Sequence, residues 1–104
     1  MQTINVAKDF TRFPSGRYAK NGETSGEAFR ERFLAPPIAE GKVVLVNLDG
    51  TIGYGSSFLE EAFGGLVRKL RLPSAELRPL LRLISTDSGL IDEINGYIDD
   101  AYKS

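Results

Sequence analysis

Two adjacent hydroxyl side chains, Ser56 and Ser57, follow a glycine-rich loop and precede a stretch whose apolar residues recur at helical spacing. Both are therefore expected at a helix N-terminus, where unpaired backbone N–H groups and the positive end of the helix dipole favour an anion. Two interpretations stay open. The serines cap the helix, with Ser57 and Glu60 at the capping-box spacing, or the loop and helix start bind a phosphate or another anion.

Asp49 is the second candidate for chemistry. The run Asn47-Leu48-Asp49-Gly50-Thr51 resembles the D-x-D-x-T motif of haloacid-dehalogenase phosphatases, in which the first Asp attacks phosphorus and helps to hold magnesium. Here Asn47 stands at the nucleophile position, and a neutral amide cannot replace a carboxylate in either role. We therefore expect Asp49 to form a turn after a strand, with its carboxylate bonded to loop backbone.

The residue types missing from the chain exclude most familiar enzyme chemistries. Without His there is no Ser-His triad, imidazole base or His-based metal site, and without Cys there is no thiol nucleophile or zinc thiolate site. The glycine-rich loop also lacks the lysine of a phosphate-binding P-loop. We therefore expect a protein that is not an enzyme and that uses no cofactor or metal.

A strand and a helix must position the loop. Residues 43–48 are apolar except for Asn47, which predicts the central strand of a sheet, covered on both faces. The loop residues expected to turn the backbone at the carboxyl edge of that sheet are Asp49, Gly50, Gly53 and Gly55. The helix that follows is predicted from an apolar face formed by Leu59, Ala62, Phe63, Leu66, Val67 and Leu70.

The residues before this unit predict a strand and a helix. Residues 3–10 alternate as a strand does, and the Pro- and Gly-rich stretch 11–26 could fold back as a short antiparallel strand carrying Phe13 and Tyr18. Thr24 and Glu27 have capping-box spacing ahead of a helix over residues 25–34. The buried side of this helix is expected to include Ala28, Phe29, Phe33 and the stem of Arg32, and the helix is expected to end at Pro36 and Pro37.

The residues after the unit predict a third strand and a last helix. Residues 80–84 are expected to pair in parallel with the central strand after a polar link, because Pro79 disfavours helix before it. The alternative is a broken helix over residues 74–84. Asp87 or Ser88 caps the final helix, whose apolar stripe is Leu90, Ile91, Ile94, Ile98 and Ala101.

The whole chain is expected to form a single domain over residues 1–104. Its alternating strands and helices predict an α/β fold with a small, mostly parallel sheet and three to four helices packed on it. A net charge of −1 provides no field for nucleic acid or a membrane, although positive charge gathers at Arg68, Lys69, Arg71, Arg78 and Arg82. No signal peptide or membrane span is evident, so we expect a cytoplasmic protein.

Residues 47–59 are similar in length and character to the D-L-S-G-V-x-x-x-D-S-S-G-L stretch of STAS domains, the sulfate transporter and anti-sigma factor antagonist domains. More closely, the chain resembles a bacterial STAS-like family of unknown function. The shared blocks SGExFRxxxL, Gly-Tyr-Gly-Ser-Ser-Phe and Glu-Ala-Phe-Gly-Gly-Leu lie at residues 25–34, 53–58 and 61–66.

The resemblance implies a non-enzymatic switch module. In anti-sigma factor antagonists a serine at the helix start is phosphorylated by a partner kinase that doubles as the anti-sigma factor, and the charge decides whether the two stay bound. Ser56 falls on that serine, and Ser57 beside it is a second candidate for phosphorylation. The chain departs from the pattern at Gly55, where the pattern has Asp, and at Phe58, where it has Gly.

We therefore expect a regulatory protein, such as a histidine-kinase-like ATPase or an anti-sigma factor, to bind the loop and helix start at residues 49–58. The expected partner-binding residues are Asp49, Gly50, Gly53, Tyr54, Gly55, Ser56, Ser57 and Phe58. The alternative is a domain that senses a small molecule or nucleotide by holding its anionic group at the same helix N-terminus.

Overall fold

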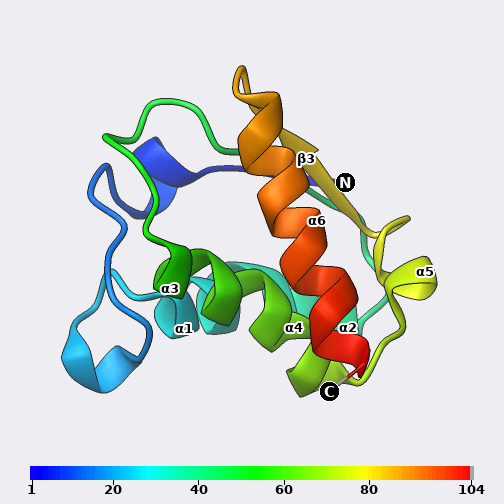
Figure 1. Ribbon diagram of the computed structural model, residues 1–104. Coiled ribbons are helices and arrows are strands. Elements are labelled where there is room, and N and C mark those ends of the chain that lie inside the picture. Colours follow the sequence, from blue (N-terminus) through cyan, green and yellow to red (C-terminus); the bar gives the residue numbers. More distant parts are fainter. Residues whose placement is uncertain (104) are drawn as a thin grey trace.

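Three short parallel strands form the sheet in a computed structural model that describes residues 1–103 (Figure 1). The strands are β1 (Gln2–Asn5), β2 (Val44–Asn47) and β3 (Leu81–Ile84), and they lie in the order β1-β2-β3. In the register, Leu45 lies beside Thr3 on one side and Arg82 on the other. The predicted α/β fold, the central position of β2 and the strand at residues 81–84 are therefore confirmed.

Helices follow each strand. The first covers residues 26–39 and the second residues 56–70, and each contains one wider π-helical turn in its middle. Their parts are α1 (Gly26–Phe29), η3 (Arg30–Leu34) and α2 (Ala35–Ala39), then α3 (Ser56–Leu59), η4 (Glu60–Gly64) and α4 (Gly65–Leu70). The remaining helical segments are η1 (Val6–Phe10), η2 (Ala19–Asn21), α5 (Ser74–Leu77) and α6 (Ser88–Lys103).

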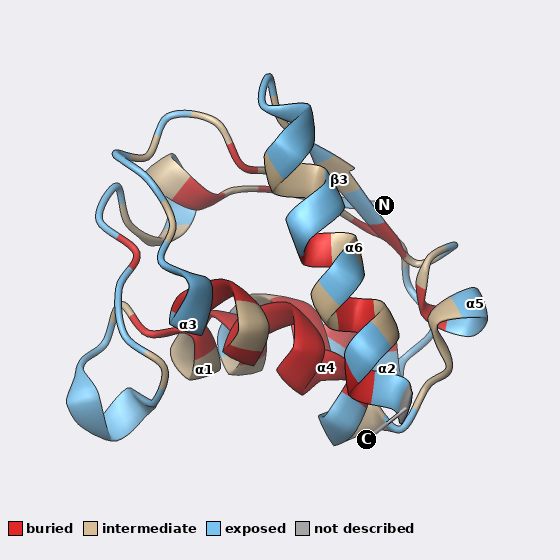
Figure 2. Ribbon diagram, viewed as in Figure 1, coloured by how far each residue is buried: buried red, intermediate tan, exposed pale blue. Residues whose placement is uncertain are grey.

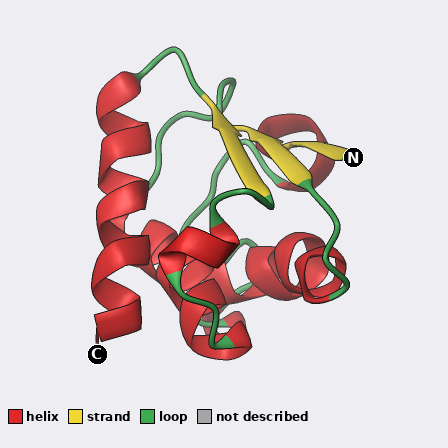
Figure 3. Cartoon of the chain, turned by 90° about the vertical axis from the view of Figure 1, so that its right-hand side faces the viewer, coloured by secondary structure: helices red, strands yellow, loops and turns green. Residues whose placement is uncertain are grey.

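The long helices cover one face of the sheet and leave the other face open (Figure 3). Val44 and Val46 on the covered face are buried, whereas Leu45 and Asn47 on the opposite face are partly exposed. The expectation that this strand is covered on both faces was therefore wrong. When neighbouring strands follow one another in one direction, right-handed crossovers place both connecting helices on the same face.

The core lies between this covered face and the helices, and Figure 2 shows the buried residues concentrated there. The predicted apolar faces of the second helix and of α6 are confirmed, since Phe63, Leu66, Ile94 and Ile98 are buried. Phenylalanine rings from three segments meet near the start of the second helix: Phe10, Phe29 and Phe58 lie with ring centroids 5.3–6.4 Å apart. These ring contacts hold the start of that helix in its position against the rest of the core.

The N-terminal segment differs from its prediction. β1 ends at Asn5, because the side chain of Asn5 accepts a hydrogen bond from the Lys8 amide and the chain turns into η1. Within residues 1–103, the sheet has only the three parallel strands, so the suggested antiparallel strand at Phe13 and Tyr18 does not form. The side chain of Ser25, not Thr24, caps the first helix by accepting from the Ala28 amide at 3.1 Å.

The first helix also continues through Pro36 and Pro37, contrary to prediction. The π-helical turn before them bonds the Ala35 amide to the Arg30 carbonyl, and α2 then starts afresh. Both prolines lie in the first turn of α2, where a missing N–H leaves no intrahelical bond unmade.

The C-terminal part contains one helix more than expected, since α5 forms within the predicted polar link. The Asp87 carboxylate accepts from the Leu90 amide at 3.2 Å, which confirms the predicted cap of α6. Across residues 1–103, none of the helices combines the length and apolar character that a transmembrane span requires.

Candidate functional site

The loop at residues 48–55 leaves β2 at the carboxyl edge of the sheet, and Asp49 ties it to the neighbouring strand. One carboxylate oxygen of Asp49 accepts from the Thr86 amide at 2.9 Å and lies 3.2 Å from the Thr86 hydroxyl and 3.4 Å from that of Ser85. Asn47 in turn accepts from the Asp49 amide at 3.0 Å. Asp49 therefore holds the ends of β2 and β3 together, whereas Asn47 bonds only within its own segment. Asp49 bonds backbone as expected, although in the loop after β3.

Tyr54 closes the loop from its other end. Its hydroxyl donates to the Leu48 carbonyl at 2.7 Å, and its ring lies 5.9 Å from that of Phe58. Burial, aided by the negative charge of Asp49, raises the pKa of Tyr54 to about 12. The phenol therefore stays protonated at neutral pH and acts as a fixed donor rather than as an acid or base.

Glycines let the loop follow this path. Gly50 and Gly53 have φ values of +99° and +145°, a region that side-chain-bearing residues rarely adopt. A Cβ atom at Gly50 would also lie 3.1 Å from the side chain of Ala7, so the loop passes close to η1. Gly55 has an ordinary extended conformation and open space around it, and it is the N-cap residue of the second helix.

Ser56 and Ser57 are exposed, and neither caps the helix. The predicted capping box is wrong because the Glu60 carboxylate points to arginines instead of the helix N-terminus. Two hydroxyls and the first backbone N–H groups of a helix are thus presented together at the surface. Phe58 is only 1% exposed and belongs to the core, so it supports this surface from below.

An ion-pair network lies one helical turn after the serines and includes two residues that the sequence did not single out, Arg17 and Arg30. Arg17 donates to Glu60 at 2.6 Å and to Glu61 at 3.2 Å, so the loop before the first helix is tied to the second helix. Arg30 is buried and donates to the Glu61 carboxylate at 2.7 Å and to its carbonyl at 2.8 Å.

The network also favours the ionised form of the Glu60 carboxyl group. Hydrogen bonds from Arg68 and Arg17 hold the pKa of Glu60 below its ordinary value.

The predicted burial of the Arg32 stem is wrong, since Arg32 is exposed and Arg30 takes the interior position. An arginine and a glutamate that pair across 31 residues have no local sequence signal that identifies them.

A cleft of about 500 Å³ lies between the loop and the start of α6. Its carboxylates come from Asp49, Asp87 and Glu93, and hydroxyls of Thr51, Ser85 and Thr86 share the wall. Asp49 is bonded across the loops, Asp87 caps α6, and Glu93 accepts from Tyr97 at 2.6 Å. Within residues 1–103, no group of three or more potential ligand side chains is placed to hold a metal ion.

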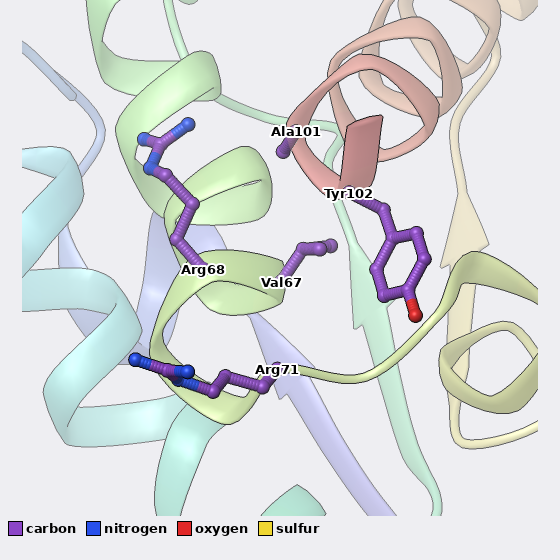
Figure 4. Close-up of a pocket in the computed structure, with 5 residues that line it drawn as sticks. All are labelled: Val67, Arg68, Arg71, Ala101 and Tyr102. Atoms are coloured by element: carbon purple, nitrogen blue, oxygen red, sulfur yellow. The ribbon is translucent and has the colours of Figure 1, made fainter. Parts of the chain in front are cut away.

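A second hollow, of about 490 Å³, lies at the far ends of α4 and α6 (Figure 4). Arg68 and Arg71 extend away from Tyr102 there, so the polar groups do not converge on one point. Arg68 is engaged by Glu60 at 2.6 Å. Other members of the basic set are also paired, Lys69 with Glu31 and Arg78 with Asp99, so these charges do not form one basic surface.

Comparison with known proteins identifies one similarity. A family model described as a STAS-like domain of unknown function matches residues 25–89, from the start of the first helix to the start of α6. This range contains the loop, both serines and the members of the ion-pair network other than Arg17. No curated protein and no solved structure matches the chain.

Proposed function

Because the chain belongs to the family of STAS-like domains of unknown function, we propose that it is a non-enzymatic regulatory module that binds a partner protein through the loop and helix start at residues 49–58. The observation that carries the proposal is the exposure of Ser56 and Ser57. Neither hydroxyl caps the helix, and both lie in its first turn, directly after a loop that Tyr54 and Asp49 hold in place. A rigid, exposed loop on a packed scaffold is the usual position of a recognition surface.

Phosphorylation of Ser56, or of Ser57 beside it, is the switch in this proposal. A phosphate adds a charge of about −1.5 to −2 and three acceptor oxygens. The helix N-terminus favours that charge, so the modified domain keeps its fold while its surface gains negative charge. A partner that binds the neutral serines is then repelled, or a partner arginine is recruited. The proposed partner is a histidine-kinase-like ATPase or an anti-sigma factor.

Affinity capture from native cells tests the proposal, with wild type, Ser56→Asp and Ser57→Asp as baits and mass spectrometry to identify partners and phosphate. Ser74→Asp is the matched control, since Ser74 begins α5, which precedes β3 and so lies toward the amino edge of the sheet. We expect one stoichiometric ATPase-like protein with wild type and with Ser74→Asp, and its loss with Ser56→Asp. If every bait captures the same partners and no phosphoserine is found, the proposed phosphorylation switch is wrong.

A small-molecule or nucleotide sensor is the alternative function, and the cleft beside the loop is the observation that favours it. Three carboxylates in its wall count against an anionic ligand. Isothermal titration of the purified protein with ATP and GTP distinguishes the two functions, because the partner-binding module is expected to give no heat of binding with either nucleotide.

A further inference from the structure

The chain contains two Asn-Gly dipeptides, Asn21–Gly22 and Asn95–Gly96, and the fold places them in opposite surroundings. An asparagine followed by glycine is chemically labile, because glycine has no side chain to keep its amide nitrogen away from the preceding carboxamide. The two dipeptides have the same chemistry, so the structure decides which of them reacts.

Asn21–Gly22 forms the tip of an exposed turn. Asn21 is the last residue of η2, and residues 18–23 are all exposed. In Figure 2 this turn is the pale-blue projection at the lower left. Two backbone hydrogen bonds close it, from the Asn21 amide to the Tyr18 carbonyl at 2.9 Å and from the Gly22 amide to the Ala19 carbonyl at 3.1 Å. The Asn21 side chain makes no hydrogen bond with residues 1–103.

The Gly22 nitrogen can be freed without disturbing the rest of the fold. Gly22 has a φ of +151°, and a Cβ atom built on it would meet nothing within 4 Å in the part of the chain that the structure describes. Only the bond to the Ala19 carbonyl must open before the nitrogen can turn toward the Asn21 side chain. An exposed bond at the end of a three-residue helix opens easily, because no buried contact opens with it.

Asn95–Gly96 lies in the middle of α6, a helix of 16 residues. The neighbouring Ile94 and Ile98 are buried, and the Asn95 carbonyl accepts a hydrogen bond from Arg78 at 3.4 Å. Attack by the Gly96 nitrogen needs backbone torsions outside the helical range, so part of α6 would have to leave the core first. The fold therefore protects this second dipeptide.

We infer that Asn21 is a site of spontaneous deamidation. The Gly22 nitrogen attacks the carboxamide carbon of Asn21 and forms a new N–C bond. The nitrogen loses its proton, and the carboxamide nitrogen leaves with that proton as ammonia, which gives a five-membered succinimide ring. Water then adds to one of the two ring carbonyls and opens the ring. The products are aspartate, with the original backbone, and isoaspartate, in which the chain continues through the side-chain carboxyl group.

The modification changes the surface and leaves the core intact. Either product carries one negative charge more than asparagine, in a chain whose net charge is only −1. Isoaspartate also adds one carbon atom to the backbone between η2 and the first helix. Residues 18–23 lie outside the core, so we expect the modified protein to keep its fold. This inference is independent of the proposed partner binding.

Peptide mapping by mass spectrometry tests the inference. The full chain is incubated at mildly alkaline pH in heavy-oxygen water, which labels each newly formed carboxyl group, and is sampled over several weeks. Electron-transfer fragmentation distinguishes isoaspartate from aspartate. The same incubation in concentrated guanidinium chloride is the reference, because the unfolded chain protects neither dipeptide. Asn21→Gln is the variant control, since its longer side chain would have to close a six-membered ring.

In the denaturant we expect Asn21 and Asn95 to react at similar rates. In the folded protein Asn21 should react at a rate within about tenfold of its rate in the denaturant, and at least about tenfold faster than Asn95. The product at Asn21 should include isoaspartate. Asn21→Gln should abolish the label at this position and leave the urea midpoint of unfolding unchanged.

Three outcomes overturn the inference. Equal rates at Asn21 and Asn95 in the folded protein would show that the exposed turn gives no advantage over the helix. A rate at Asn21 that falls by much more than tenfold on folding would show that the turn protects its asparagine. Label at Asn21 without any isoaspartate would show that the reaction is direct hydrolysis and not ring closure by Gly22.

Discussion

At the scale of single residues, Tyr54 decides the shape of the loop. Its hydroxyl donates to the Leu48 carbonyl, and its ring packs on Phe58. The loop therefore has an anchor at each end, Tyr54 at one and Asp49 at the other. Between the anchors, Ile52 and the glycines face solvent. This arrangement keeps an exposed loop in one position.

Removing the Tyr54 hydroxyl tests the first anchor. We expect Tyr54→Phe to lower the free energy of unfolding by about 1 kcal/mol, because the Leu48 carbonyl loses its side-chain donor. Urea unfolding at neutral pH measures the loss. Tyr18→Phe is the control, since Tyr18 is exposed and its hydroxyl makes no hydrogen bond with residues 1–103. An equal loss in both variants would contradict a specific role for Tyr54.

The difference in stability between wild type and Tyr54→Phe should depend on pH. Tyr54 ionises near pH 10.0 in the unfolded chain and near pH 12 in the folded protein, so the folded state holds its proton longer. Its stabilising contribution is present below pH 10.0 and is lost as the pH rises toward about 12. Over that range the stability of the wild type should therefore fall toward that of Tyr54→Phe, as measured by urea unfolding at each pH.

At the scale of elements, the first and second helices approach closely at Gly26. A Cβ atom there would clash with the Phe58 carbonyl and would lie 3.1 Å from the Ala62 amide. Both neighbours belong to the backbone of the second helix, so neither can move aside cheaply. The start of the second helix, with its serines, is therefore positioned by a glycine of the first.

Two glycine-to-alanine changes test this contact against helix propensity. Gly26→Ala is expected to lower the free energy of unfolding by about 1–3 kcal/mol through overpacking. Gly96→Ala, in the exposed part of α6 with open space around it, is expected to raise it by about 0.5–1 kcal/mol. Urea unfolding of both variants gives the comparison. A stabilised Gly26→Ala would mean that the two helices are not in close contact.

Local patterns in the sequence predict these elements, and contacts between distant residues decide their ends and caps. The apolar run of β2 and the helical spacing of Phe63, Leu66, Ile94 and Ile98 are readable directly, because period and burial are local properties. The capping box at Ser57 fails because Arg17 and Arg68 engage Glu60 from 43 and 8 residues away. The candidate loop and the helix start after it were predictable from their glycines and serines.

At the scale of the whole molecule, the Glu60 and Glu61 network joins the loop at Arg17, the first helix at Arg30 and the second helix at Arg68. These segments form one side of the helical layer. The Glu60 carboxylate is a shared acceptor for Arg17 and Arg68, and its pKa is lowered by both. Acid should therefore weaken this side of the molecule.

The sign of that effect is testable with Glu60→Gln. A carboxylate with a lowered folded pKa stabilises the protein above its unfolded pKa, near 4.5, and loses that contribution as the pH falls through the folded pKa. We expect Glu60→Gln to lower the free energy of unfolding by about 1 kcal/mol at neutral pH, with the difference from wild type shrinking below about pH 4.5.

The matched control is Glu40→Gln, whose partner Lys42 lies 3.0 Å away in an exposed pair. Its effect should stay within about 0.5 kcal/mol at every pH, because exposed ion pairs contribute little. Urea unfolding at a series of pH values measures all three proteins. A constant difference between Glu60→Gln and wild type across the series would show that the charge of Glu60 is not what stabilises the fold.

The order of the strands bears on how the molecule is assembled during synthesis. Each strand lies beside the one made just before it, so β2 can pair with β1 as soon as it leaves the ribosome, and β3 can then join at the open edge. No finished pair of strands must separate to admit a later one. The loop at residues 48–55 follows β2 directly, but its Asp49 anchor is completed only when Thr86 emerges, so the loop becomes fully anchored only after β3 has been made.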